Sequence, residues 1–366
     1  MQFIDLKAQY QASREKINQR IQDVLDHGQY IMGPEVTELE RALVDFTGAA
    51  ECVTVSSGTE ALFIALMALG IGPGDEVITS PFTFAATAEV IALVGATPVF
   101  VDVEFDTCNI DASLIEAAVT ERTRAIMPVS LYGQVPDMED INRIAARHNL
   151  TVIEDAAQSF GASYRDKKSC AVSRIGCTSF FPSKPLGCYG DGGAIFTDDP
   201  ILAKRMREIR VHGQEKRYYH TQLGVGGRMD TIQCAVVLAK LETFGSEITA
   251  RMKAGQRYLD AFAGQNKIGL PIVRSDRDCV WAQFTIKVDE RDRVAAHLQS
   301  NGIPTAIHYP VPLHKQPAYA ELCRISGVLA ISEELGRGVL SLPMHPFIEA
   351  GEQDRVVAAV LEAVYQ

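Results

Sequence analysis

Positive charge is scarce in this sequence. Its 366 residues include 35 lysines and arginines against 46 aspartates and glutamates, which gives a formal net charge of −11. A surface of that sign repels nucleic acid and anionic lipid headgroups over most of its area. The charge balance therefore argues against general binding to nucleic acid or membrane, and it favours a small ligand.

Cysteine pairs, metal-ligand spacing and long apolar runs are also missing. The eight cysteines are scattered without a Cys-x-x-Cys pair, and His212, His220, His308 and His314 lack the spacing of metal ligands on a helix. We therefore expect reduced thiols and no metal site. No run approaches the roughly eighteen apolar residues of a membrane helix, and the N-terminal segment carries charges where a signal peptide would be apolar. The sequence predicts a cytoplasmic protein.

The middle of the chain has the pattern of an α/β protein. From about residue 50 to residue 212, short apolar or β-branched runs alternate with amphipathic stretches, which is typical of a mostly parallel sheet covered by helices. We expect seven strands, near 51–55, 76–80, 98–103, 124–130, 151–154, 175–180 and 193–197. The intervening helices are expected near 59–70, 84–94, 111–119, 137–148 and 200–211.

The last third of the chain has a different texture. A long helix is expected over 231–262, followed by a strand over 280–288 and a helix over 291–301. The segment 8–27 is expected to form a helix that packs back onto the rest. Because the chain is too long for one small core, we predict a large domain over 1–240 and a smaller α+β domain over 241–366.

Lys184 is a lone ammonium among apolar and small residues, in the segment Cys177-Thr-Ser-Phe-Phe-Pro-Ser-Lys-Pro-Leu-Gly187. Burial lowers the pKa of such an amine, and the free amine can condense with an aldehyde. Asp155 ends an apolar strand about thirty residues earlier, where a carboxylate can keep a pyridine nitrogen protonated. Singly, Lys184 could be a loop lysine and Asp155 a helix N-cap. Together they suggest an enzyme that uses pyridoxal 5′-phosphate (PLP).

A phosphate group fits at the start of one predicted helix. Ser57, Gly58 and Thr59 follow a strand and open that helix, whose backbone N–H groups can bind an anion. The same residues also fit a simple capping box. Ser179, five residues before Lys184, could add a hydroxyl to the same phosphate or could be an ordinary strand serine.

Phe84 and Gln158 are candidates for contacts with the ring. Phe84 follows a strand end, where its side chain could stack on a pyridine, although a core aromatic is commoner. Gln158 lies at the carboxyl end of a central strand, where ligands bind in open α/β sheets, and its amide could donate to a phenolic oxygen. The glycine-rich stretch 190–193 precedes a strand, so we expect a turn there and not a dinucleotide-binding loop.

These motifs together resemble those of the sugar-nucleotide aminotransferases of the DegT/DnrJ/EryC1/StrS family. The resemblance covers the chain, from Gly28-Gln-Tyr-Ile-Met-Gly-Pro34 through His308-Tyr-Pro310 to Ser341-Leu-Pro-Met-His345. It implies the aspartate-aminotransferase fold (PLP fold type I) and a homodimer with active sites at the subunit interface. Related dehydratases carry histidine at the lysine position, so Lys184 favours transamination.

The resemblance also implies a role for each candidate residue. Asp155 pairs with the pyridinium nitrogen, Gln158 contacts the phenolic oxygen and Phe84 stacks on the ring. Lys184 binds PLP and moves a proton between substrate and cofactor carbons. Glutamate is the implied amino donor, and the ketone of a UDP-linked sugar is the acceptor. The residues implied to hold the phosphate are Gly58, Thr59 and Ser179.

One position departs from the family pattern. Members usually read Gly-x-Asn-x-Arg-Met where this chain has Gly224-Val-Gly-Gly-Arg-Met229, and the family asparagine reaches the cofactor phosphate of the neighbouring subunit. Gly226 has no side chain for that contact. Either the Gly-Gly backbone supplies N–H groups as an anion nest, or the cofactor is held more weakly.

A basic and aromatic cluster over 211–220, with Arg228 shortly after it, indicates an anionic substrate, although surface charges are often merely solvated. His308 and Tyr309 are expected at the sugar or the diphosphate. Within the family, the motif His-Gly-Gln-x-x-Arg-Tyr most resembles aminotransferases of UDP-2-acetamido-2-deoxy-ribo-hexuluronate, a step toward 2,3-diacetamido sugars of bacterial surface polysaccharide such as the LPS O-antigen. We expect Arg228 or the His212 loop to receive the uronate carboxylate.

Two other functions stay open at this point. One is a related aminotransferase for another UDP- or dTDP-linked 3-keto or 4-keto deoxysugar, which equal activity on a neutral 6-deoxy substrate would favour. The other is a PLP-binding regulator without turnover, although the sequence contains no DNA-binding segment. Substrate-dependent conversion of glutamate to 2-oxoglutarate would exclude the regulator.

Overall fold

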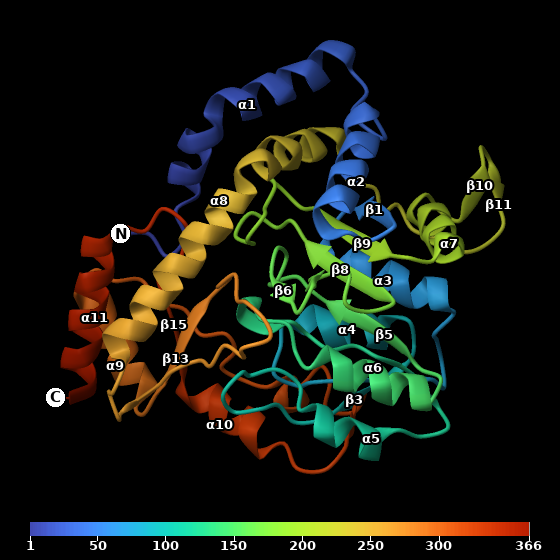
Figure 1. The fold of residues 1–366 in the computed structure, drawn as a ribbon. Coiled ribbons are helices and arrows are strands. Elements are labelled where there is room, and N and C mark those ends of the chain that lie inside the picture. The colour runs from blue at the N-terminus through green and yellow to red at the C-terminus, as the bar shows by residue number, and fades with distance from the viewer. Residues whose placement is uncertain (366) are drawn as a thin grey trace.

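The computed structural model describes residues 1–365, and an eight-stranded sheet forms its centre (Figure 1). The strand order is β1-β9-β8-β5-β4-β2-β3-β14, and all neighbours are parallel except that β9 runs antiparallel to β1 and β8. The predicted α/β class with a mostly parallel sheet is confirmed. The strands are β1 (Glu51–Val55), β2 (Glu76–Thr79), β3 (Thr97–Phe100), β4 (Thr123–Ile126), β5 (Thr151–Asp155), β8 (Ile175–Ser179), β9 (Gly193–Thr197) and β14 (Arg324–Ile325).

Helices cover both faces of this sheet because its strands send apolar side chains to both sides. In β1, Val53 and Val55 pack toward α3 and α7, whereas Cys52 packs toward α2 and α8. That alternation follows from the two-residue period of a strand. The helices around the sheet are α2 (Pro34–Thr47), α3 (Gly58–Leu69), α4 (Ala85–Leu93), α5 (Ile115–Ala118), α6 (Met138–Arg147), α7 (Pro200–Arg210) and α8 (Thr231–Phe262).

The long helix α8 leads from the large sheet to a second core (Figure 1). Its first half contributes Val237 and Phe244 to the core under the sheet, and its second half contributes Tyr258 and Phe262 to the other. The helix α1 (Leu6–His27) packs along α8. The domain boundary at residue 240 stays a prediction. The second core is built around β12 (Ile268–Gly269), β13 (Phe284–Val288), β15 (Val339–Leu342), α9 (Arg291–Ser300) and α11 (Ala350–Tyr365).

One strand was not predicted, and two predicted elements differ from the structure. The eighth strand, β14, was not predicted, because its two half-exposed residues are too few to show the alternation of apolar and polar side chains that marks a strand. The strand expected over 280–288 begins at Phe284, because Trp281 has a φ of 49° and interrupts the extended backbone. The helix expected over 111–119 is a 3₁₀ turn followed by the four residues of α5. Elements without a prediction are α2, α10 (Ala330–Gly338), α11, β12, β15, β6 (Ser163–Tyr164), β7 (Lys167–Lys168), β10 (Gln214–Lys216) and β11 (Tyr219–His220).

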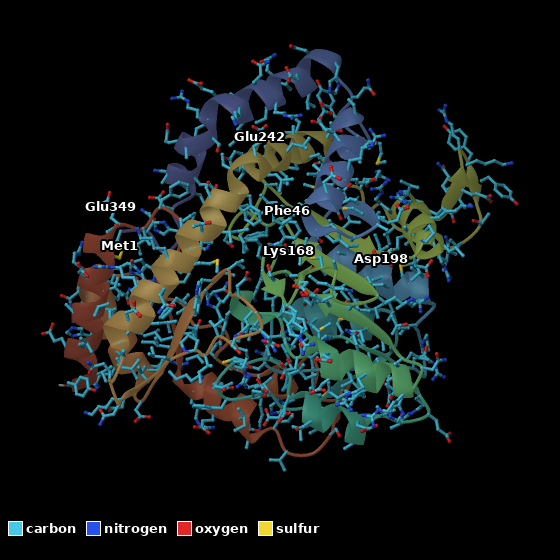
Figure 2. All side chains as sticks on the ribbon, viewed as in Figure 1. Met1, Phe46, Lys168, Asp198, Glu242 and Glu349 are labelled. Carbon is cyan, nitrogen blue, oxygen red and sulfur yellow. The ribbon has the colours of Figure 1, made fainter. Side chains whose placement is uncertain are left out.

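The strands β10 and β11 form a hairpin that extends away from the large sheet, at the right of Figure 1. Figure 2 shows its side chains reaching away from the rest of the chain, and Tyr218 at the turn is 80% exposed. This hairpin carries the basic and aromatic cluster found in the sequence. No helix within residues 1–365 combines the length and the apolar content needed to cross a membrane.

Candidate active site

A cavity of about 490 Å³ lies at the carboxyl edge of the large sheet, a volume typical of small-molecule sites. The segments that follow β1, β2, β5 and β8 meet there, because these strands run in the same direction and end at the same edge. Nine predicted site residues line this cavity: Gly58, Thr59, Phe84, Asp155, Gln158, Ser179, Lys184, His308 and Tyr309.

Lys184 lies in the loop after β8, and its backbone N–H donates to the carbonyl oxygen of Phe181 at 2.9 Å. Burial lowers the pKa of its side-chain amine, and the nearby charge of Asp155 opposes this shift. The amine therefore gives up its proton more readily than an exposed lysine, as its sequence context predicts. The free form of such an amine is the group that condenses with an aldehyde.

Asp155 is the last residue of β5, and its carboxylate is held from two sides. It accepts a hydrogen bond from Thr87 Oγ1 at 2.8 Å and one from the backbone N–H of Ala157 at 3.2 Å. Burial raises the pKa of this carboxyl, whereas the two hydrogen bonds and the charge of Lys184 lower it. A buried carboxylate with a fixed orientation is suited to face a protonated ring nitrogen.

The N-terminus of α3, where the sequence predicts a phosphate, lines the cavity. Ser57 Oγ accepts from the N–H of Glu60 at 3.0 Å, so the capping alternative holds for Ser57. The N–H groups of Gly58 and Thr59 have no such partner within the described chain and are available to an anion. A Cβ at Gly58 would lie 2.6 Å from the Ser179 Cβ, so glycine is required for helix and strand to approach this closely.

Phe84 and Gln158 also line the cavity. The Phe84 ring is 56% exposed, and its centroid lies 6.3 Å from that of Tyr309. Gln158 Oε1 accepts from the N–H of Tyr132 at 2.8 Å, and its Nε2 donates to the Tyr309 hydroxyl at 3.1 Å. The amide is therefore fixed with its donor side toward the cavity. Its contact with a phenolic oxygen stays a prediction.

This donor set fits PLP. The wall of the cavity combines a buried carboxylate suited to the ring nitrogen, a helix N-terminus suited to the phosphate, an amine and an exposed aromatic ring. Several further lining residues were not predicted, among them Phe181, Asp191 and Gln283. Asp191 belongs to the predicted turn at 190–193, but Gln283 was hidden in what looked like a regular strand.

Arg228 and His212 are the two predicted residues that do not line this cavity. They flank Gly226 instead, where an added Cβ would lie 3.3 Å from the His212 ring and 3.4 Å from Arg228 Nη2. Within residues 1–365 the Arg228 guanidinium forms no hydrogen bond or ion pair. The structure thus divides the predicted residues into one group that lines the cavity and a smaller group beside it.

His308 carries no charge at neutral pH. Burial, and then the charge of Lys184, lowers the pKa of its imidazole from 6.5 to about 4, and its Nδ1 lies 2.8 Å from Ser341 Oγ. The unfolded chain binds this proton below pH 6.5 and the folded chain does not until about pH 4. His308 therefore costs the folded protein no stability above pH 6.5. As the pH falls from 6.5 toward 4, proton binding to the unfolded chain lowers the free energy of unfolding.

We expect the melting temperature of His308→Gln to fall less between pH 7 and pH 5 than that of the wild type. Thermal unfolding of both proteins across this range measures the difference. His148→Gln, on the exposed surface, is the matched control. Parallel profiles for wild type and His308→Gln would contradict the assignment.

Residues 11–361 match the sequence model of the DegT/DnrJ/EryC1/StrS aminotransferase family. A relative from Pseudomonas aeruginosa, the UDP-2-acetamido-2-deoxy-3-oxo-D-glucuronate aminotransferase, is 53% identical over 98% of this chain and 99% of its own. A crystal structure of a DegT DnrJ EryC1 StrS aminotransferase from Brucella abortus superposes with a TM-score of 0.97 at 42% identity, covering 100% of both chains. NtdA from Bacillus subtilis with bound cofactor PMP matches with a TM-score of 0.93 at 32% identity, covering 100% of this chain and 85% of its own. The chain belongs to the DegT/DnrJ/EryC1/StrS aminotransferase family.

Proposed function

We propose that this protein transfers the amino group of glutamate to the 3-keto group of a UDP-linked 2-acetamido uronic acid. The chain is a PLP-dependent nucleotide-sugar aminotransferase. The observation that carries the substrate is the 53% identity, over nearly the whole of both chains, to an enzyme of UDP-2-acetamido-2-deoxy-3-oxo-D-glucuronate. The aminated sugar would then serve the synthesis of 2,3-diacetamido sugars for bacterial surface polysaccharide such as the LPS O-antigen, in the cytoplasm.

We assign a different task in transamination to each of several residues of the cavity. When bound, PLP supplies an electron sink for charge that develops on the substrate carbon. Asp155 would hold the proton on the ring nitrogen, and the N–H groups of Gly58 and Thr59 would hold the phosphate. Lys184 Nζ takes up and returns the proton at the substrate carbon that bears the nitrogen, a task that its lowered pKa suits.

The charges in the cavity point to a contribution from a second subunit. Of the described residues that line it, Lys184 is the single lysine and none is an arginine. Glutamate brings two carboxylates, and the sugar brings one carboxylate and a diphosphate. Because Arg228 and His212 lie outside the cavity of their own chain, beside the exposed hairpin, we propose a homodimer in which they serve the partner's cavity.

The substitution Arg228→Ala is expected to lower kcat/KM for the uronate about 10- to 100-fold, because a guanidinium binds a carboxylate with two charge-assisted hydrogen bonds. The loss is expected to be smaller for the 6-hydroxymethyl analogue, which has no carboxylate. Arg143→Ala, which removes an exposed arginine of α6, is the matched control. An undiminished preference for the uronate would refute the role of Arg228.

Mixed dimers show whether Arg228 acts across the interface. Coexpression of Lys184→Ala with Arg228→Ala gives a heterodimer of the two variants. If Arg228 serves the partner's cavity, one of the two cavities in this heterodimer has both native residues. If Arg228 serves its own cavity, neither cavity has both. We then expect activity well above that of either variant alone. Activity that stays at the level of Arg228→Ala would place Arg228 in the cavity of its own chain.

The proposed substrate is tested by adding glutamate and then the UDP-linked 3-keto uronate, made in situ by its dehydrogenase. Release of 2-oxoglutarate together with an aminated uronate, detected by mass, supports the proposal. Release of 2-oxoglutarate without aminated uronate would keep the aminotransferase and reject this sugar, and a neutral 6-deoxy keto sugar would be the next acceptor. A protein that binds PLP but never converts glutamate would favour the regulator.

A further inference from the structure

Lys240 is a buried lysine that contacts the loop carrying Lys184. It lies in the first half of α8 and is only 2% exposed. Its Nζ atom donates to the carbonyl oxygen of Gly187, three residues after Lys184, and lies 5.2 Å from the centroid of the Tyr189 ring. Both contacts are made to the stretch of chain that follows Lys184.

The charge of Lys240 is costly to bury. Within residues 1–365 no carboxylate lies at ion-pair distance from its Nζ atom, although the charge of Glu247 acts on it from farther away. Burial lowers the pKa of the amine from 10.5 to about 8, so it still carries its charge at neutral pH. A methionine side chain would fill the same space without this cost. The charge is therefore expected to serve the contact with Gly187.

The loop that carries Lys184 closes on itself. It runs from Phe180 to Cys188, and the N–H of Cys188 donates to the carbonyl oxygen of Phe180 at 2.7 Å. A Cβ at Gly187 would lie 2.6 Å from the carbonyl oxygen of Pro182, so the two limbs of the loop are in contact. These contacts fix the shape of the loop. Its orientation also depends on contacts with the rest of the fold.

Helix α8 supplies two such contacts from one of its faces, because Gln233 and Lys240 are seven residues apart. Gln233 Oε1 accepts from the N–H of Tyr189 at 2.8 Å, and its Nε2 lies 3.4 Å from the Tyr189 carbonyl oxygen. Lys240 holds the carbonyl of Gly187. We infer that Lys240 is a positioning residue that, through Gly187, fixes the orientation of the Lys184 loop. This inference rests on the proposed role of Lys184.

The substitution Lys240→Met removes the charge and the donor and keeps the approximate length of the side chain. We expect the maximal rate of 2-oxoglutarate release from glutamate in single turnover to fall about 10- to 100-fold, because a displaced Lys184 meets the substrate carbon less often. The apparent affinity for glutamate is expected to stay within about threefold of wild type. Lys253→Met, which replaces an exposed lysine of α8, is the matched control.

Competition with a free amine measures the placement of Lys184 without turnover. Methylamine added to the holoenzyme displaces Lys184 from PLP, and borohydride reduction followed by mass measurement gives the fraction of PLP still on the lysine. The methylamine concentration for half displacement is expected to be about 10-fold lower in Lys240→Met, because a displaced lysine has a lower effective concentration.

The second variant, Gln233→Leu, removes the neutral contacts to Tyr189 and tests the same limb of the loop if Lys240→Met does not fold. We expect it to lower the rate and the methylamine midpoint by less, about 2- to 5-fold, since a neutral hydrogen bond is weaker than a charged one. An effect of neither variant on the midpoint would contradict the inference.

Three results in Lys240→Met would overturn the inference and leave the role of Lys184 intact. Wild-type values of both the rate and the methylamine midpoint would mean that Lys184 is placed without Lys240. A lowered melting temperature with an unchanged midpoint would make Lys240 a residue of the fold alone. A weaker affinity for glutamate at an unchanged maximal rate would place its effect on substrate binding. A wild type that never carries PLP on Lys184 would instead reject the proposed role of that lysine, and the inference with it.

Discussion

Replacement of Lys184 by alanine is expected to lower kcat for transamination by at least about 10³-fold, because it removes the proposed covalent anchor of the cofactor and the proposed base that moves the proton. Lys184 lines the cavity, and burial lowers the pKa of its amine. Release of 2-oxoglutarate from glutamate, followed under single-turnover conditions, measures the loss.

Lys167→Ala is the matched control for this substitution, since Lys167 is an exposed lysine in the β6–β7 hairpin. Added methylamine is expected to restore part of the activity of Lys184→Ala, because a small free amine can enter the space left by the side chain. A fold that is lost, seen as a lower melting temperature, would show no such rescue. Near-normal turnover in Lys184→Ala would reject the assignment of this lysine.

The structure brings most of the predicted site residues to one cavity because those residues stand at strand ends. Asp155, Ser179 and Gly58 each follow or close a short apolar run, and parallel strands bring their carboxyl ends to one edge. The positions of these residues at strand ends in the sequence therefore predict that they lie close together in the fold. Lys184 was found by a different signal, as an isolated charge in an apolar segment.

The rest of the site depends on contacts between distant segments, which local patterns do not contain. Thr87, which holds the Asp155 carboxylate, lies inside a helix and 68 residues away in the chain. Gln283 was hidden because Val280 to Val288 reads as one continuous strand, and the turn at Trp281 is set by tertiary packing. Arg228 was expected near the substrate, but it lies outside the cavity of its own chain. A single sequence does not show which subunit a residue serves.

Replacement of Asp155 by asparagine is expected to lower kcat about 10²- to 10⁴-fold in both half reactions, while the fold is retained. Asparagine has nearly the same shape, but it is neutral and cannot hold a proton on the ring nitrogen, so the electron sink is lost. The amide also places a donor where Thr87 Oγ1 and the Ala157 N–H now donate, so at least one hydrogen bond must be given up. Single-turnover rates with glutamate and with the keto sugar measure the effect.

The substitution Thr87→Val separates the effect of the Asp155 charge from the effect of the orientation of its carboxylate. It keeps the Asp155 carboxylate and removes one of its two donors, so we expect a loss well below that of Asp155→Asn, of about 3- to 30-fold. Asp166→Asn, an exposed aspartate in the turn between β6 and β7, controls for the loss of a charge elsewhere. If Asp155→Asn and Thr87→Val lost equal factors, orientation alone would explain both results. The ion pair with the ring nitrogen would then contribute little to the rate.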